Sequence, residues 1–257
     1  MHEFRKHLKK LRAALWLVAD EVGKDRHLLE DRSVRQIAKV VSGVRDAHVR
    51  FQTVVQIHKQ LSDHGFGKVF QHLEDLLALE AESFAAAAAG WEKQVVRRLK
   101  AIEKRISRWN LKHLRWKQVC SAVAASYRRG QAGLARALKK PSPKNFHAWR
   151  KEVKELWYKL RIFAPLNRVV LEEIANNAKK LGDLLGQHHD FIFLLERLDC
   201  EQGDPSLEQE RAKLRKLIRK RTKKLQRDAT ELGRRFYAEP RKAFAKRISI
   251  FTQDWSS

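Results

Sequence analysis

Basic side chains recur at helical spacing at the start of the chain. His2, Arg5, Lys9 and Arg12 follow the positions i, i+3, i+7 and i+10, and this spacing places all four on one face of an α-helix. Apolar residues at positions 4, 8, 11 and 15 fall on the opposite face. Because a row of aligned cations repels itself, the pattern indicates either a solvent-exposed basic face or a surface that binds an anion.

The same row of residue types appears again in the second part of the chain. His147, Arg150 and Lys154 repeat it at a shift of 145 residues, with Trp157 in place of the last cation. Because the row recurs with a histidine at its first position in both parts of the chain, we favour the interpretation that it binds an anion over that of a solvent-exposed basic face. The histidines are the natural hydrogen-bond donors to such an anion.

A second pair of matching segments supports an internal duplication. The step Arg45-Asp46 recurs as His189-Asp190 at a shift of 144 residues, close to the shift of the basic row. We therefore divide the chain into a first half, residues 1–140, and a second half, residues 141–257. We expect Asp46 and Asp190 to orient neighbouring basic groups rather than to act as bases.

The boundary between the halves is marked by helix-breaking residues. Pro141 and Pro143 are not tolerated inside a helix, and Asn145 is the candidate N-cap of the helix that carries His147. The chain has only 11 Gly and 5 Pro, too few for the frequent turns of a sheet-rich fold. We predict an all-α fold with about four helices in each half.

Positive charge is concentrated in two segments. The chain has 55 Lys and Arg against 30 Asp and Glu, a formal net charge of +25. Residues 93–129 hold twelve of these cations and one acid, and residues 211–247 hold sixteen cations and three acids. This concentration predicts a polyanionic partner. Within the two segments, further basic rows with helical spacing include Arg105, Arg108 and Lys112, and Lys216, Lys220 and Lys223.

The remaining composition indicates a cytoplasmic protein. Cys120 and Cys200 form no paired motif, which is typical of a reducing compartment. The apolar run at residues 13–19 is short and meets acidic residues at once, so we interpret it as part of an amphipathic helix rather than a signal peptide. No stretch approaches the roughly 18–20 apolar residues of a membrane span, and we expect no membrane partner.

In combination, these residues resemble the CHAD family, the conserved histidine α-helical domain. Its first motif is a His followed by basic residues at +3, +7, +8 and +10, matched by His2, Arg5, Lys9, Lys10 and Arg12. Its second-half motif is matched by His147, Arg150, Lys154 and Tyr158, with Trp157 where the family has Arg. The step Leu-Gly-x-x-His-Asp is matched at residues 185–190, and the segments 127–130 and 232–237 also resemble the family.

The resemblance spans essentially the whole chain and implies two four-helix bundles related by a pseudo-twofold axis. It also implies a basic central cavity that binds long-chain inorganic polyphosphate, and an association with polyphosphate granules. Such a ligand requires Lys and Arg on a rigid wall, because it has one charge per phosphate and no bases to stack. The predicted polyphosphate-binding residues are His2, Arg5, Lys9, Arg12, Arg45, Arg105, Arg108, Lys112, Arg128, His147, Arg150, Lys151, Lys154, His189, Lys216, Lys220 and Lys223.

Two other functions remain open at this point. The first is a nucleic-acid-binding helical protein, although we expect nucleic acid to bind non-specifically at most. The second is a phosphotransfer or phosphohydrolase enzyme with His2 or His147 as phosphoacceptor, which would require a base or a metal nearby. We expect neither a metal site nor a cofactor, because no HExxH or paired-cysteine spacing occurs and the histidines lie among cations. We therefore predict binding without catalysis.

Overall fold

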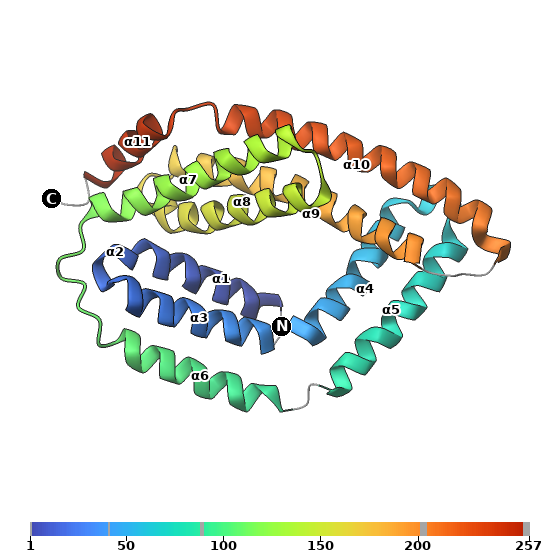
Figure 1. Cartoon of the computed structure of the whole chain (residues 1–257), viewed down its shortest axis with the longest axis horizontal. Coiled ribbons are helices and arrows are strands. Elements are labelled where there is room, and N and C mark those ends of the chain that lie inside the picture. Colours follow the sequence, from blue (N-terminus) through green and yellow to red (C-terminus); the bar gives the residue numbers. More distant parts are fainter. Residues whose placement is uncertain (1, 41, 88–89, 201–204, 254–257) are drawn as a thin grey trace.

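The structure is a computed structural model that describes residues 2–40, 42–87, 90–200 and 205–253; for residues 2, 42–45, 85–87 and 253 it describes the backbone only. Within these residues the fold is all-α, as predicted, with no β-strand (Figure 1). The α-helices are α1 (His2–Leu17), α2 (Ala19–Val22), α3 (Lys24–Val40), α4 (Ser42–Gln60), α5 (Gly67–Ala87), α6 (Trp91–Ile106), α7 (Trp116–Lys139), α8 (Pro143–Phe163), α9 (Leu171–Cys200), α10 (Glu208–Phe236) and α11 (Arg241–Gln253). The 3₁₀ helices are η1 (Ser62–His64), η2 (Ala164–Leu166) and η3 (Pro205–Leu207).

The two predicted halves contain different numbers of helices. The described part of the second half has four α-helices, α8 to α11, as expected, whereas that of the first half has seven instead of about four. Three of the extra breaks coincide with glycines at positive φ: Gly23 at 85°, Gly65 at 73° and Gly90 at 89°. Glycine adopts this backbone conformation without the steric cost that other residues meet, so Gly23 can follow α2 directly, Gly65 can follow η1 directly and Gly90 can directly precede α6.

The N-terminus of α8 differs in detail from the prediction. Ser142, not Asn145, is the N-cap, and its hydroxyl oxygen accepts a hydrogen bond from the backbone N–H of Asn145 at 3.3 Å. Pro143 occupies the first turn, where its missing N–H leaves no hydrogen bond unmade. The cap holds the start of α8, and so the position of His147, in a defined place.

The largest hydrophobic core is built from α7, α8, α9 and α11. Trp149 on α8 is fully buried at its centre. A Cβ atom at Gly133 of α7 would lie 2.7 Å from the Trp149 ring, and one at Gly233 of α10 would lie 2.6 Å from it. The indole therefore fits between two neighbouring helices only because both positions are glycine.

Two smaller cores complete the molecule. One lies between α4, α5, the C-terminal half of α9 and α10, and the other lies between α1, α3 and α6. In Figure 1 α10 forms the upper edge of the molecule and α6 the lower edge, with α8, α9, α1 and α3 between them. α7 precedes residue 141 but packs mainly against α8 and α11. The division into sequence halves stays a prediction.

None of the described helices is both long enough and apolar enough to cross a membrane. The longest, α9 and α10, each carry several charged residues along their length.

Candidate anion-binding site

The structure brings together two of the predicted histidines on neighbouring helices. His147 on α8 and His189 on α9 lie with their ring centroids 4.5 Å apart. The adjacent His188 points elsewhere: it is buried, and its Nε2 is 3.0 Å from the side-chain amide of Gln226 on α10. The side chain of His2, the predicted counterpart of His147, lies outside the described residues.

Two glycines of α9 lie against the basic side chains of α8. A Cβ atom at Gly182 would lie 3.0 to 3.2 Å from the end of the Lys154 side chain, and one at Gly186 would lie 3.7 Å from the Arg150 guanidinium. The two glycines are four residues apart, so they line one face of α9. The Arg150 and Lys154 side chains extend over this face of α9. At Gly182 a Cβ atom would press on the Lys154 side chain, whereas at Gly186 it would make only an ordinary van der Waals contact with Arg150. We call His147, Arg150, Lys151, Lys154 and His189 the α8–α9 site.

The electrostatics of the site keep both histidines neutral when no anion is bound. Burial, followed by the charges of Lys151 and Arg150, lowers the pKa of His147 below its usual value of 6.5. Burial also lowers the pKa of His189 to about 4, and the adjacent His147 and Arg150 add to the effect. Burial raises the pKa of the neighbouring Asp190 carboxyl, and the positive charge of Arg150 opposes that rise.

Two polar atoms of the site are buried without a hydrogen-bond partner among the described residues. They are Nδ1 of His147 and Nε of Arg150. Buried polar groups are almost always hydrogen-bonded, and each one left unpaired costs about 1–3 kcal/mol. Both nitrogens can donate a hydrogen bond, so an acceptor that approached the site would satisfy them.

The site continues along α8 into a cleft that faces α1. Lys154 donates to Asp183 at 2.8 Å, and Lys179 donates to the other oxygen of the same carboxylate at 3.1 Å. Although burial opposes it, these hydrogen bonds hold the pKa of Asp183 below its usual value. Lys154 also lies over the ring of Trp157, 4.9 Å from its centroid. The position of Trp157 therefore supports a neighbouring cation.

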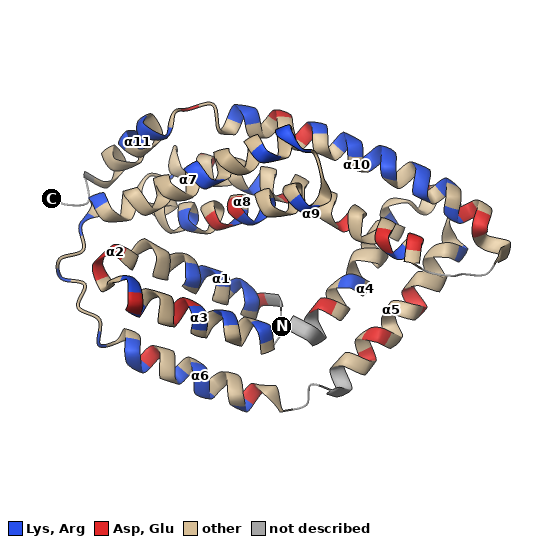
Figure 2. Cartoon of the chain, viewed as in Figure 1, with Lys and Arg blue, Asp and Glu red and all other residues tan. Residues whose placement is uncertain are grey.

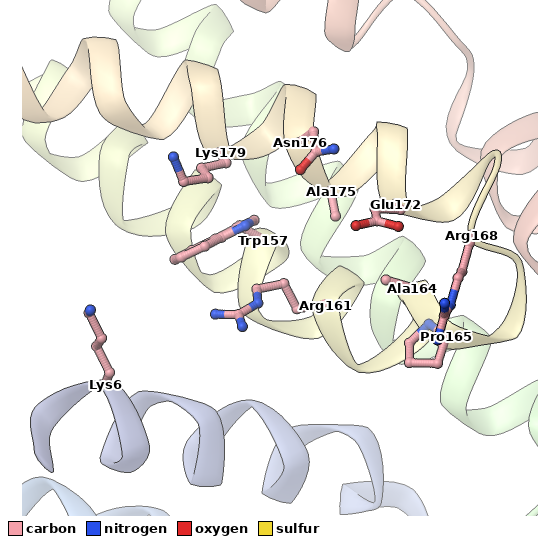
Figure 3. Close-up of a pocket in the computed structure, with 10 residues that line it drawn as sticks. All are labelled: Lys6, Trp157, Arg161, Ala164, Pro165, Arg168, Glu172, Ala175, Asn176 and Lys179. Atoms are coloured by element: carbon pink, nitrogen blue, oxygen red, sulfur yellow. The ribbon is translucent and has the colours of Figure 1, made fainter. Parts of the chain in front are cut away.

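Figure 3 shows this cleft, which has a volume of about 660 Å³ and lies between α1 and the α8–η2–α9 segment. Lys6 reaches towards it from α1, and Arg161, Arg168 and Lys179 line the opposite wall with Trp157. None of these four cations was among the predicted residues. Arg161, Arg168 and Lys179 lie outside the repeated row. Lys6 had a signal in the sequence, because it matches the predicted Lys151 at the shift of 145 residues.

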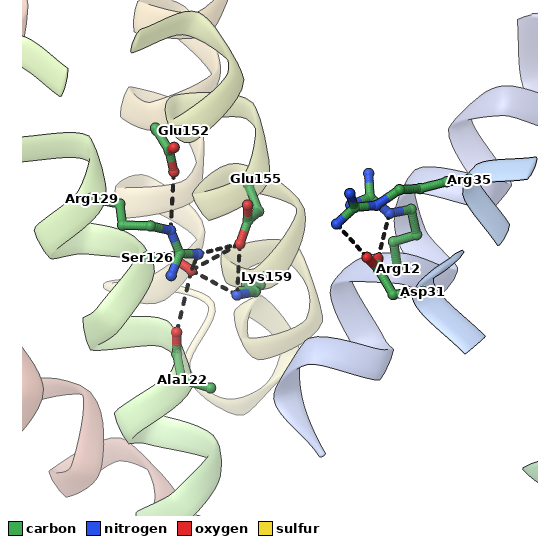
Figure 4. Close-up of polar contacts among 9 residues, drawn as sticks. All are labelled: Arg12, Asp31, Arg35, Ala122, Ser126, Arg129, Glu152, Glu155 and Lys159. Atoms are coloured by element: carbon green, nitrogen blue, oxygen red, sulfur yellow. Dashed lines mark hydrogen bonds and ion pairs between the residues drawn. The ribbon is translucent and has the colours of Figure 1, made fainter. Parts of the chain in front are cut away.

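The basic row of α1 is engaged with acids of other helices. Arg5 donates to Asp46 of α4 at 2.8 Å, as expected for an aspartate that orients a basic group. Arg12 donates to the buried Asp31 of α3 at 2.7 Å, an acid that also pairs with Arg35 (Figure 4). Lys9 is exposed. These ion pairs fix α1 against α3 and α4 and reduce the charge that this row offers to a ligand.

A buried polar network lies behind the site, on the side of α8 that faces α7. Lys159 is 1% exposed, and its ammonium donates to Glu155 at 3.0 Å and to Ser126 at 2.7 Å. Arg129 donates to the same Glu155 and to Glu152 (Figure 4). Burial lowers the pKa of Lys159, and the charge of Glu155 opposes that change. The network locks α8 to α7 and was not predicted, because it joins residues from two helices.

The other predicted residues are spread over the molecule. On α6, Arg105 makes a two-pronged contact with the buried Glu30 of α3, at 2.6 and 2.8 Å. Arg108 and Lys112 are exposed in the connection that follows α6, and Arg128 is exposed on α7. Lys216, Lys220 and Lys223 are exposed on α10, at the opposite edge of the molecule from α6 (Figure 2). The side chain of Arg45 lies outside the described residues.

No group of three or more His, Cys, Asp or Glu side chains that could hold a metal ion occurs among the described residues. The described groups of the α8–α9 site are instead donors and cations, which suit an anion.

The comparisons with known proteins gave one match. A family model described as CHAD domain matches residues 1–199, which include α1 to α9 almost to the end of α9. Neither the curated proteins nor the solved structures gave a match to the chain.

Proposed function

The chain belongs to the CHAD domain family, and we propose that it binds inorganic polyphosphate through the α8–α9 site. The family is known in general terms for binding this polymer. The proposed mode is electrostatic capture without turnover, by Lys, Arg and His side chains held on rigid helices. The proposed partner is a long polyphosphate chain, free in the cytoplasm or as part of a granule.

The pair of unpartnered donors in the α8–α9 site is the observation that carries the proposal. His147 Nδ1 and Arg150 Nε are buried beside the exposed Lys151 and beside Lys154, whose ammonium pairs with Asp183. Phosphate oxygens accept hydrogen bonds from both kinds of nitrogen, and a charge-assisted bond is about twice as strong as a neutral one. Bound phosphate would thus accept hydrogen bonds from both of these buried donors.

The neutral histidines add selectivity for a highly charged ligand. A phosphate chain beside His147 and His189 supplies the opposite charge that favours their protonated forms. Each histidine would then change from a neutral group into a cation that contacts the ligand. The negative charge of a weakly charged ligand is too small to favour protonation of the two histidines to the same extent.

The proposal includes a duplicated fold with a basic cavity. The basic row of α1 recurs on α8 at a shift of 145 residues, and the segment Arg45-Asp46 of α4 recurs on α9 at a shift of 144 residues. The repeated segments thus lie on helices in the same order in the two halves. We place the basic wall of this cavity on α8 and α9 and on the facing side of α1. The cleft between α1 and the α8–η2–α9 segment supports that placement.

The experiment is a binding titration with tripolyphosphate on wild type and on the double variant Arg150→Gln, Lys154→Gln. We expect affinity to fall by about tenfold or more, since a hydrogen bond to a charged group contributes about 1.5–3 kcal/mol. The matched control is Lys24→Gln, Arg26→Gln, which removes the same charge from exposed positions on α3 and should bind as wild type does.

Two results would contradict the proposal. Equal loss in the double variant and in the control would show that only net charge matters. Orthophosphate released from the polymer during the titration would show catalysis instead of binding.

A further inference from the structure

A separate row of cations lies on α10, beyond the residues that the family model matches. Lys216, Lys220, Lys223, Arg227 and Arg234 are all exposed and share one face of this helix, and we call them the α10 stripe. The stripe is about 27 Å long, at ~1.5 Å per residue. Figure 2 shows the Lys and Arg residues of α10 as a series of blue bands along the outer edge of the molecule.

The acids of α10 do not neutralise the stripe. Asp228 pairs with Lys224 at 2.7 Å, and Glu231 pairs with Arg235 at 2.5 Å; both of these cations lie outside the stripe. Within the described part of the chain, no ion pair involves a member of the stripe. Every exposed residue of α10 between positions 212 and 235 is charged except Ala212. The surface therefore offers positive charge and almost nothing else.

A cleft connects the stripe to the neighbourhood of the α8–α9 site. It has a volume of about 750 Å³ and is lined by Lys223 and Arg227 of α10 and by Phe146 of α8, the residue directly before the site's first histidine. Gln226 on α10 contacts His188 on α9 at the same level. The cleft thus runs from the stripe to the first turn of α8, and His188 and His189 of α9 contact α10 and α8, respectively.

We propose that the α10 stripe is a second anchoring surface for a long polyphosphate chain, one segment of which occupies the α8–α9 site. This inference rests on the proposed function. Two-point attachment raises affinity through the effective concentration of the second segment, by as much as ~100-fold or more, without any new kind of contact. The protein would therefore select chains long enough to reach both surfaces.

The chemistry of the stripe favours a flexible polymer without bases. A straight row of cations can follow a flexible chain along its whole length. A DNA duplex is stiff over about 150 base pairs, and its strands wind away from a straight helix after a few phosphates. Single-stranded nucleic acid needs aromatic side chains for stacking, and a lipid surface needs exposed large apolar ones. The exposed residues of this face of α10 include neither.

The test compares two ligands and three proteins. The ligands are tripolyphosphate, which fills one site, and a polyphosphate chain of roughly 100 units, which reaches both. The proteins are wild type, the stripe variant Lys216→Gln, Lys220→Gln, Lys223→Gln, and the control Lys93→Gln, Lys100→Gln, Lys104→Gln. The control removes three exposed lysines in a row on α6, so its change in net charge and in residue type is the same.

We expect the stripe variant to bind tripolyphosphate as wild type does and to lose about tenfold or more in affinity for the long chain. The slope of log affinity against log salt for the long chain should fall by about 2, since each cation that contacts a phosphate contributes ~0.7–0.9. The control should keep wild-type affinity for both ligands.

Three results would overturn the inference. If the stripe variant keeps its preference for the long chain, the stripe takes no part, while the proposed function stands. If the α6 control loses as much affinity, the effect is one of net charge. If duplex DNA at equal phosphate concentration displaces the long chain from the stripe, the surface is for nucleic acid. Failure of wild type to bind either polyphosphate would instead overturn the proposed function, and this inference with it.

Discussion

His189 makes the stability of the protein depend on pH in a way that can be calculated from the structure. Burial, together with His147 and Arg150, lowers the pKa of His189 to about 4, whereas an unfolded chain has a histidine pKa of about 6.5. Between these pH values the unfolded state holds a proton that the folded state lacks. The free energy of unfolding therefore decreases as the pH falls from about 6.5 to about 4. The contribution of His189 between about pH 7.5 and pH 4.5 is about 2 kcal/mol, at ~1.4 kcal/mol per pKa unit.

The assay is urea unfolding of wild type and of His189→Gln at these two pH values. Glutamine does not titrate, so the variant should lose about 2 kcal/mol less than wild type on acidification. Burial also lowers the pKa of His188 to about 4, and that residue keeps its own contribution in both proteins. The control His113→Gln changes an exposed histidine in the α6–α7 connection and should follow wild type.

Acid lowers the stability of the protein through His189, but it should strengthen the binding of polyphosphate at the same residue. Bound phosphates favour the charged form of His147 and His189, so binding takes up protons and affinity rises as the pH falls below about 6.5. In His189→Gln this rise should be smaller. Identical pH slopes for wild type and variant, in both unfolding and binding, would refute the view that His189 is buried neutral and becomes protonated beside the ligand.

Two further predictions concern contacts between helices outside the α8–α9 site. Glu155→Gln leaves Lys159 buried without its carboxylate, so the free energy of unfolding should fall by about 3–5 kcal/mol in denaturant titrations. The double variant Glu155→Gln, Lys159→Met should recover much of this loss. A loss below about 1 kcal/mol in the single variant would contradict the stabilising role of the network. Gly130→Ala places a Cβ atom 2.0 Å from the Tyr237 hydroxyl and should lower the melting temperature clearly. In the control Gly67→Ala the added Cβ atom has no neighbour within 4 Å, so the melting temperature should stay at the wild-type value. Equal melting temperatures for the two variants would contradict the close contact between Gly130 and Tyr237.

The all-α class and the basic rows could be predicted from the sequence because they depend on local properties. Few Gly and Pro residues and an apolar repeat of about 3.6 are sufficient to predict helices. The same repeat places Arg150 and Lys154 on one face, and it points His188 and His189 in different directions; in the structure they contact α10 and α8, respectively. The helix breaks at Gly23 and Gly65 were not predicted, because a positive φ is a property of one residue and leaves no periodic signal; Gly90, which follows a run of alanines, was predicted as a tight helix contact or a helix end.

The composition of the site depended on contacts between helices, which a local pattern cannot predict. Arg5, Arg12 and Arg105 look like free cations in the sequence, but each lies against an acid from a helix distant in the chain. His147 likewise lies against a residue distant in the chain, in this case another histidine, His189 of α9. Whether a basic side chain is available to a ligand depends on which acids the tertiary fold brings within about 4 Å of it. The sequence thus determined the positive charge and its helical spacing, and the packing of the helices decided which of those charges remain available.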